Sequence, residues 1–137
     1  VRKEVGMLAQ TRGHPNITAL IGVFCFEADN SDDFHDGEEY GSQKLHWGIV
    51  MELCPCGDLH DFLTMHGPLH ENACLEILCG TVSALTYLHR LRLVHRDVKS
   101  ENILLGEGAR PILADLGIAA SLDDEQALLR RVGSPGY

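Results

Sequence analysis

The stretch VHRDVKSENILL, residues 94–105, sets a dense group of hydrogen-bonding side chains between two apolar flanks. Asp97, Lys99 and Asn102 stand within it, and the apolar run of residues 103–105 follows at once. In an extended segment alternate side chains project to the same side, so the carboxylate of Asp97 and the ammonium of Lys99 can address one site. The apolar flanks indicate buried segments that hold this loop. The sequence therefore predicts a rigid polar loop at a cleft.

A second carboxylate follows close behind this loop. Asp115 ends the stretch PILAD, residues 111–115, which together with residues 103–105 predicts two short strands joined by a glycine-rich turn. Carboxylate and amide oxygens at adjacent strand ends suit a hard cation such as Mg²⁺. A further carboxylate could orient a hydroxyl, and a lysine could neutralise a phosphate. The set therefore contains the parts that phosphoryl transfer requires, because that chemistry depends on positioning and charge stabilisation.

Length and composition limit the possible classes of protein. The 137 residues, 45% of them hydrophobic, are enough for one ordinary domain. The net charge of −9 argues against a nucleic-acid binder and leaves no basic patch for an anionic membrane. No apolar run approaches the roughly 18 residues of a membrane span. Five cysteines without framework spacing indicate reduced thiols in a cytosolic protein.

The pattern along the rest of the chain changes from helical to extended and back. Residues 1–12 place apolar side chains on one helical stripe, and residues 17–28 and 45–53 predict strands. Residues 58–63 predict a short helix, and the regular apolar spacing of residues 71–90 makes that segment the clearest helix. A Cys-Gly link between the strands and these helices indicates two small lobes joined by a hinge.

Two further segments and one glycine indicate local structure rather than chemistry. The stretch from Glu27 to Glu39 holds seven acids, but its glycine and closing glutamate fall at the wrong offsets from Asp29 or Asp32 for a calcium loop. It therefore indicates a solvated acidic hairpin loop. Residues 118–137 are polar and turn-rich, which predicts irregular structure. Gly80 inside the long helix costs about 1 kcal/mol relative to alanine, so we expect it to permit close packing.

On its motifs the sequence resembles the eukaryotic protein kinases of the Ser/Thr type. HRDVKSEN matches the H-R-D-x-K-x-x-N catalytic loop, ADLG matches the metal-binding D-F-G with Leu116 in place of Phe, and GSPGY resembles the stretch that lines the substrate groove. The resemblance implies an incomplete two-lobed α+β fold, with part of the N-lobe sheet, helix C, the hinge and the first part of the helical C-lobe. Residues 1–53 would be the N-lobe remainder, residues 54–58 the hinge, and residues 59–137 the C-lobe portion with the catalytic loop and activation segment.

The resemblance implies ATP-dependent phosphoryl transfer to Ser and Thr hydroxyls of protein substrates. Asp97 would accept or orient the substrate hydroxyl proton, and Lys99 would meet the transferring phosphate. Asn102 and Asp115 would hold Mg²⁺. Ser134 resembles the residue that bonds the catalytic aspartate and lysine in Ser/Thr kinases.

The resemblance also implies a nucleotide site. Met51 would be the gatekeeper, Glu52 and Cys54 would offer backbone groups to adenine, and Asp58 could reach the ribose. Glu4 falls where the helix glutamate would pair with the strand lysine. Taken without the resemblance, the hinge stretch reads equally as a buried strand ending in a turn, and a lone glutamate on a helix is usually a solvated charge.

The resemblance to protein kinases also implies residues that control the activation segment. Arg96, before the catalytic aspartate, tends in this family to pair with a phosphate. Ser121 is the single hydroxyl side chain between Leu116 and Gly133. The acids at 123–125 have two interpretations, as substitutes for that phosphate or as a solvated loop.

The resemblance implies that four side chains form the hydrophobic spine of a kinase, although each is open to interpretation as ordinary core filling. They are Leu8, Leu20, His95 and Leu116. As a catalytic base His95 is disfavoured, since a packed histidine that donates to the backbone is the commoner arrangement.

Several parts of a kinase domain are not found in these residues. No glycine-rich loop precedes the first helix and no A-P-E follows GSPGY. Lys3 adjoins Glu4, and Lys44 lies in the acidic loop, so neither fits the phosphate-anchoring lysine. Because the sequence also begins at Val1 without an initiator methionine, we expect an excerpt that is inactive on its own. Its long helix should expose an apolar face.

Three functions follow from these observations. The first is a Ser/Thr protein kinase with ATP and a protein substrate as partners, no nucleic acid, no membrane segment and a cytoplasmic location. The second is a non-catalytic interaction or scaffolding module without the phosphate-clamping loop and lysine. The third is a small-molecule kinase of the aminoglycoside or choline type, which usually lacks Lys99 and GSPGY. The intact polar set favours the first.

Overall fold

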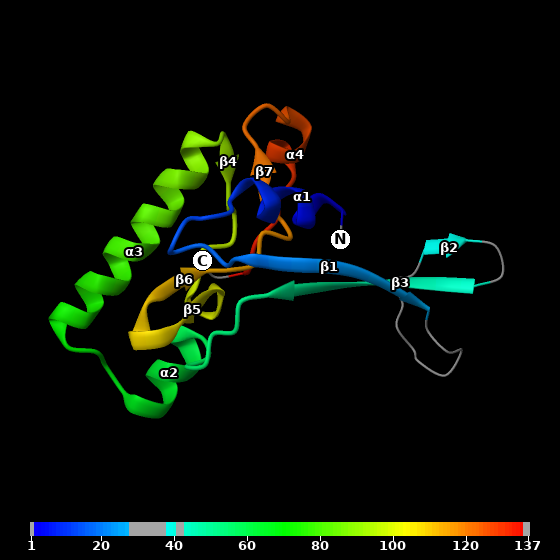
Figure 1. The fold of residues 1–137 in the computed structure, drawn as a ribbon. Helices are drawn as coiled ribbons and strands as arrows, with labels where there is room; N and C mark the ends of the chain where they lie inside the picture. The colour runs from blue at the N-terminus through cyan, green and yellow to red at the C-terminus, as the bar shows by residue number, and fades with distance from the viewer. Residues whose placement is uncertain (1, 28–37, 41–42, 136–137) are drawn as a thin grey trace.

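A three-stranded antiparallel sheet projects from one end of the molecule, and two helices lie at the other end (Figure 1). The computed structural model describes residues 2–27, 38–40 and 43–135. The helices and strands in chain order are α1 (Arg2–Gln10), β1 (Leu20–Glu27), β2 (Glu38–Tyr40), β3 (Gln43–Met51), α2 (Leu59–His66), α3 (Glu71–Arg90), β4 (Leu93–Val94), β5 (Ile103–Leu105), β6 (Pro111–Leu113), β7 (Ala120–Ser121) and α4 (Glu125–Leu129), with 3-10 turns at Ser100–Asn102 (η1) and Glu107–Ala109 (η2). Helices and antiparallel strands are segregated, which confirms the α+β class.

The large sheet has the strand order β1-β3-β2. Both long strands were predicted, and they pair with Val23 opposite Ile49. The short strand β2 was not predicted. Most of the predicted acidic loop falls on residues 28–37, which lie outside the described residues.

Both helices predicted after the hinge, at residues 58–63 and 71–90, are confirmed as α2 and α3, and local contacts explain the ends of α2. The carboxylate of Asp58 accepts a hydrogen bond of 2.9 Å from the N–H of Asp61 and caps α2. Such a cap stabilises a helix by about 1 kcal/mol. At the other end Gly67 has φ +80°, a conformation that favours glycine, and its N–H bonds the carbonyl of Leu63.

The close packing expected at Gly80 is confirmed. A Cβ atom there would lie 2.4 Å from Cγ of Pro111 and 2.8 Å from Nδ2 of Asn16. The backbone of α3 therefore presses directly on β6 and on the turn after α1. Ring stacking between His14 and Tyr87, at 4.8 Å between centroids, joins the same turn to α3.

The prediction of irregular structure for residues 118–137 was wrong in part. Strand β7 pairs with β4, with Leu93 opposite Ser121. Helix α4 follows, because the carboxylate of Asp124 accepts a 2.9 Å hydrogen bond from the N–H of Ala127 and Ala127 is buried. Both elements are too short for a periodic signal: β7 forms by pairing with β4, and α4 packs against β7.

One buried cluster joins α1, α3 and the β5–β6 hairpin. Leu8, Leu20 and Leu116 belong to it, and His95 is buried as well. All four residues of the predicted spine are thus in the interior.

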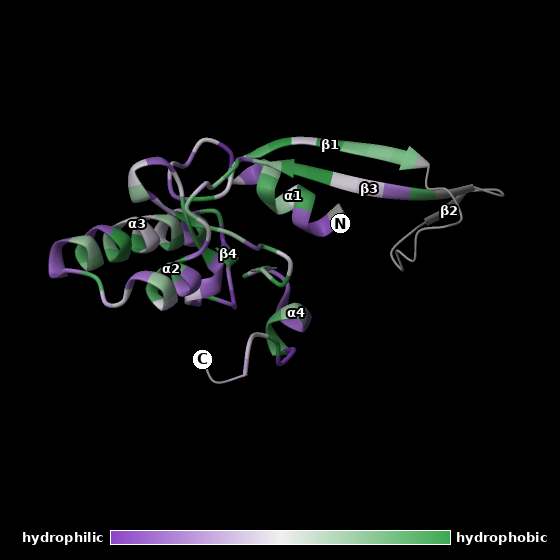
Figure 2. Cartoon of the chain, turned by 90° about the horizontal axis from the view of Figure 1, so that it is seen from below, coloured by the Kyte–Doolittle hydropathy of each residue, from purple (hydrophilic) through white to green (hydrophobic). Residues whose placement is uncertain are grey.

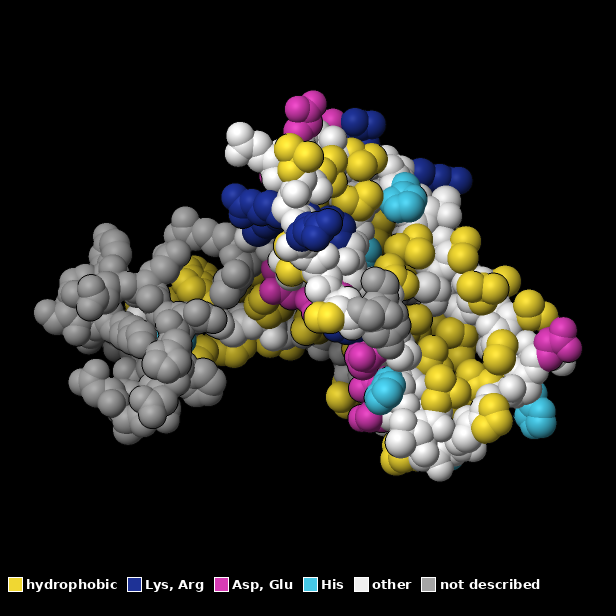
Figure 3. Space-filling view, turned by 180° about the vertical axis from the view of Figure 1, so that it is seen from behind, with side chains coloured by type: hydrophobic (Ala, Val, Ile, Leu, Met, Phe, Trp, Pro, Cys, Tyr) yellow, Lys and Arg dark blue, Asp and Glu magenta, His cyan; other side chains and the backbone are white. Residues whose placement is uncertain are grey.

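The apolar face of α3 is exposed, as predicted. Leu75, Leu78 and Val82 on this helix are 51%, 58% and 50% exposed. A cavity of about 520 Å³ lies between α2 and α3 and includes Leu63 and Ile77 in its lining. Figure 3 shows hydrophobic side chains gathered over this end of the molecule, and Figure 2 shows green segments along both helices. Among the described residues no helix is long and apolar enough to cross a membrane.

Candidate active site

Asp97 is the point on which the predicted catalytic side chains converge. Its Oδ1 accepts a 2.9 Å hydrogen bond from the N–H of Ser134, and its Oδ2 lies 2.9 Å from Nζ of Lys99. Nδ2 of Asn102 donates to the same Oδ2 at 3.0 Å. Lys99 also donates to Oγ of Ser134. The structure therefore brings together four residues that the sequence separates by up to 37 positions.

These contacts determine the charge state of Asp97. The hydrogen bond from Lys99, followed by bonds from Ser134 and Asn102, lowers the pKa of Asp97 to about 2, although burial acts in the opposite direction. The same pair raises the pKa of Lys99. Asp97 is consequently a carboxylate and Lys99 an ammonium throughout the neutral range.

The amide of Asn102 is fixed in one orientation. Nδ2 donates to the carbonyl of Asp97 at 2.8 Å as well as to its carboxylate, and both partners are acceptors. The nitrogen must therefore face Asp97, which turns Oδ1 to the opposite side. The carbonyl of Asn102 also accepts a 2.8 Å bond from the N–H of Ala114, so the residue that follows, Asp115, comes next to it.

Asp115 is exposed and has a left-handed backbone, with φ +62°. Its Oδ1 accepts a 3.0 Å hydrogen bond from the N–H of Gly117, which leaves the second carboxylate oxygen for a ligand. Among the described residues no group of three or more His, Cys, Asp and Glu side chains is placed to hold a metal ion. One carboxylate and one amide oxygen fit Mg²⁺, which keeps several waters and binds substrate phosphates.

His95 is buried and holds the loop together by hydrogen bonds to the backbone. It is 2% exposed, its Nε2 donates to the carbonyl of Ala114 at 2.9 Å, and its Nδ1 accepts from the N–H of Asp97 at 3.2 Å. This pair of bonds requires the neutral tautomer with the proton on Nε2. Burial lowers the pKa of His95 and favours the same neutral form. The contacts agree with the interpretation of a packed structural histidine.

Arg96 has partners that the sequence did not indicate. Its guanidinium donates to the carbonyl of Ile118 at 2.5 and 2.7 Å and to the carbonyl of Ala127 at 2.5 Å. Asp123 supplies no negative charge to Arg96, because it forms a 2.7 Å ion pair with Arg92 instead. That alternative for the acidic residues is therefore wrong for Asp123.

Asp124 and Ser121 have local roles in the same segment. The carboxylate of Asp124 is used to cap α4, so it too makes no substitute for a phosphate on Arg96. Ser121 lies in β7, and its Oγ accepts a 3.1 Å hydrogen bond from the N–H of Asp123. No sequence signal distinguishes Arg92, two residues after the end of α3, from an ordinary surface arginine.

The segment after β3 is tied to the turn before β1. Glu52 donates its N–H to the carbonyl of Ala19 at 3.0 Å and accepts the N–H of Ala19 on Oε1 at 2.8 Å. Its Oε2 lies 3.1 Å from Nη2 of Arg110. Met51 ends β3 and is 41% exposed. Burial, and next the carboxylate of Glu52, raises the pKa of the Cys54 thiol.

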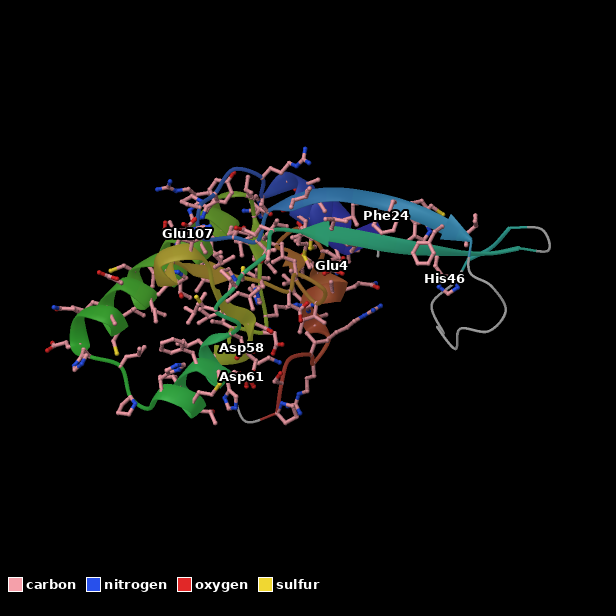
Figure 4. The ribbon with its side chains drawn as sticks, turned by 60° about the horizontal axis from the view of Figure 1, so that its bottom comes forward. Glu4, Phe24, His46, Asp58, Asp61 and Glu107 are labelled. Atoms are coloured by element: carbon pink, nitrogen blue, oxygen red, sulfur yellow. The ribbon has the colours of Figure 1, made fainter. Side chains whose placement is uncertain are left out.

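Two predicted nucleotide contacts lie apart from each other. Asp58 uses one carboxylate oxygen as the cap of α2. Glu4 is half-buried on α1, and Figure 4 shows it well separated from Asp58 and Asp61 at the start of α2. The backbone carbonyl of Glu52 and the N–H of Cys54 bond no other residue in the described part of the chain.

Comparison with known proteins identifies the family. The model of the protein kinase domain matches residues 1–137. Serine/threonine-protein kinase PEPKR2 of Arabidopsis thaliana is 34% identical over 137 residues, which are 100% of this chain and 26% of that protein. The liver/testis isoform of the human phosphorylase b kinase gamma catalytic chain is 32% identical over 136 residues, 99% of this chain and 29% of that protein. Probable serine/threonine-protein kinase PknB of Bifidobacterium longum is 31% identical over 140 residues, 99% of this chain and 19% of that protein.

The chain thus spans less than a third of the length of each of these curated relatives. The match nevertheless extends from the first helix to the end of the chain, and it includes the loop around Asp97. The expected resemblance is confirmed over the full sequence. This chain belongs to the protein kinase family, and its α+β fold is part of a protein kinase domain.

Proposed function

We propose that this chain is the central part of a Ser/Thr protein kinase that transfers the γ-phosphoryl group of ATP to a protein hydroxyl. The observation that carries the proposal is the convergence of Lys99, Asn102 and Ser134 on the carboxylate of Asp97. A carboxylate fixed by three donors has little freedom to move, so it presents a constant geometry to an incoming hydroxyl.

Asp97 acts first as a hydrogen-bond acceptor. With a pKa of about 2 it is a weak base, so it orients the hydroxyl toward the phosphorus rather than ionising it beforehand. As the new bond from the hydroxyl oxygen to phosphorus forms, the bond to the oxygen of ADP breaks, and the proton becomes acidic enough to pass to Asp97. Lys99, held between Asp97 and Ser134, offers its remaining donor to the transferring phosphate.

Oδ1 of Asn102 and the free oxygen of Asp115 are the proposed ligands of Mg²⁺. Bound there, Mg²⁺ would neutralise charge on the phosphates of ATP. The support for this site is the orientation of the Asn102 amide, which follows from its two hydrogen bonds to Asp97.

The remaining assignments are part of the same proposal. Residues 1–53 form the N-lobe remainder, residues 54–58 the hinge, and residues 59–137 the C-lobe portion. The Glu52 carbonyl and the Cys54 N–H, which bond no other described residue, bind adenine beside Met51. We also assign Asp58 to the ribose through its second oxygen and Glu4 to the lysine that anchors the phosphates.

A cytoplasmic location is proposed on the support of the five cysteines, all of which are free thiols. Arg96 and Ser121 belong to the control of the activation segment in this proposal. The scaffolding alternative gains no support from the relatives, which are named as kinases or as a kinase catalytic chain.

The test is transfer of labelled phosphate from Mg·ATP to Ser/Thr peptides by the protein at its natural length. We expect transfer that stops when Mg²⁺ is chelated and that is lost in Asp97→Ala. Asp61→Ala, an exposed acid on α2, is the matched control and should retain transfer. Transfer by Asp97→Ala at the wild-type rate would overturn the proposal.

A further inference from the structure

The carboxylate of Glu52 uses both of its oxygens to join two separate parts of the chain. Oε1 accepts the N–H of Ala19 at 2.8 Å, and Oε2 lies 3.1 Å from Arg110. The N–H of Glu52 itself donates to the carbonyl of Ala19 at 3.0 Å. The backbone at Glu52 is thus held by two bonds to one residue and by one ion pair to another.

Arg110 stands at the start of the strand that leads to the proposed metal ligand. Its carbonyl accepts a 2.9 Å hydrogen bond from the N–H of Gly106, which closes the turn between β5 and β6. From Arg110 the three residues of β6 and then Ala114 lead to Asp115. The ion pair therefore joins the segment after β3 to the strand that carries Asp115.

The segment before β1 fills the space between these two parts. The N–H of Leu113 donates to the carbonyl of Asn16 at 2.9 Å, and the N–H of Thr18 donates to the carbonyl of Leu113 at 3.0 Å. Nδ2 of Asn16 donates to the carbonyl of Pro111 at 2.8 Å. Residues 16–19 are consequently bonded to β6 on one side and to Glu52 on the other.

We propose that Arg110 is a positioning residue for the nucleotide, because its ion pair with Glu52 fixes the adenine-binding backbone relative to Asp115. The inference rests on the proposed function and adds a residue that belongs to none of its motifs. Two other ion pairs, Lys99 with Asp97 and Arg92 with Asp123, both lie within residues 92–123. The Arg110–Glu52 pair instead reaches the segment after β3.

The exposure of the Arg110–Glu52 pair indicates that it affects nucleotide affinity more than global stability. The side chains of Arg110 and Glu52 are 40% and 23% exposed. Ion pairs that are open to solvent add little to global stability. Loss of the pair should leave the protein folded. It should instead make the distance between the adenine-binding backbone and the proposed metal ligand more variable. Nucleotide affinity, rather than peptide affinity, is the quantity expected to change.

The experiment measures the Kd of Mg·ATP by titration calorimetry on the protein at its natural length, with the KM values of ATP and of a peptide beside it. Arg110→Ala should raise Kd about threefold to tenfold. Glu52→Gln keeps an acceptor for Ala19 and removes the charge, so it should raise Kd by the same factor. Because both changes remove one interaction, the double variant should be no weaker than either single variant.

Two further variants separate positioning from a general structural effect. Arg110→Lys keeps the charge and should recover most of the affinity at low salt. Arg92→Ala breaks an exposed ion pair of the same kind away from Glu52 and should leave the Kd of Mg·ATP unchanged. A Kd for Arg110→Ala equal to that of the wild type, or an equal rise for Arg92→Ala, would overturn the inference, as would additive losses in the double variant.

The wild-type protein distinguishes the two proposals. A wild type that binds Mg·ATP but transfers no phosphate would overturn the proposed function, while the Kd comparison would still decide the role of Arg110. A wild type that binds no Mg·ATP would overturn both.

Discussion

The main-chain N–H of Ser134 donates a 2.9 Å hydrogen bond to Oδ1 of Asp97, across 37 residues of sequence. The hydroxyl oxygen of Ser134 accepts a hydrogen bond from the ammonium of Lys99, which also contacts Asp97. Ser134 therefore attaches the GSPGY stretch directly to the loop that contains Asp97 and Lys99, through its backbone and through its side chain. This arrangement allows the two contributions to be separated by mutation.

Ser134→Ala removes the hydroxyl and keeps the N–H. We expect kcat to fall about tenfold, because Lys99 loses a charge-assisted hydrogen bond that fixes its position. Ser134→Thr keeps both groups and should restore kcat to within about twofold of the wild type. Steady-state kinetics on the protein at its natural length decides the matter, and a threonine variant as slow as the alanine variant would contradict this account of Ser134.

Arg96→Lys should loosen the activation segment. A guanidinium can donate to the carbonyls of Ile118 and Ala127 at once, whereas a single ammonium cannot hold both in the same geometry. We expect faster amide hydrogen exchange over residues 118–129 in the variant. Exchange over residues 118–129 that is as slow in Arg96→Lys as in the wild type would count against the carbonyl contacts.

The buried His95 should make stability fall in acid. Burial lowers its pKa in the folded state, so below the unfolded value of about 6.5 the unfolded chain binds more protons than the folded one. The free energy of unfolding should then decrease from pH 7.5 to pH 5.5. Asp97 does not contribute in this window, because its pKa of about 2 places its loss of stability between about pH 4 and pH 2.

Urea unfolding at the two pH values checks this dependence on His95. In His95→Gln the decrease should be smaller than in the wild type, and in His60→Gln, an exposed residue of α2, it should be unchanged. Equal decreases in the wild type and His95→Gln would show that another group is responsible.

Gly80→Ala should destabilise the protein although alanine favours helices. The added methyl group would lie 2.4 Å from Cγ of Pro111, and overpacking of this kind costs about 1–3 kcal/mol. The gain in helix propensity is at most about 1 kcal/mol. Gly6→Ala in α1 is the matched control, because no atom lies within 4 Å of the position of its Cβ, and it should be stabilising. Chemical denaturation compares the two, and a more stable Gly80→Ala would refute the close contact with β6.

Much of the fold could be predicted because the signals are local. The 20 residues of α3 were predicted with the observed bounds, since their apolar spacing repeats over several turns. The catalytic-loop motif likewise indicated Asp97, Lys99 and Asn102. By contrast, α4 has five residues and β7 has two, so neither shows a period. Strand β7 forms by pairing with β4, and α4 packs against β7.

The contacts between distant residues could not be predicted from the sequence. Arg110 and Glu52 are 58 positions apart, and nothing in either surrounding stretch indicates that the two side chains meet. The same holds for Arg92 and Asp123. For Arg96 the family pattern indicates a phosphate partner, which stays a prediction. Its hydrogen bonds to the carbonyls of Ile118 and Ala127 had no signal in the sequence, because both residues are more than 20 positions away.

The most direct test of the central claim is a single-turnover measurement with Asp97→Asn, combined with the Kd of Mg·ATP for the same variant. Asparagine keeps the size of the side chain and an acceptor for the N–H of Ser134, but it cannot take the proton of the substrate hydroxyl. The account predicts a phosphoryl-transfer rate lower by about 10²–10⁴-fold with Kd nearly unchanged. A variant that transfers phosphate at the wild-type rate while binding Mg·ATP normally would contradict it.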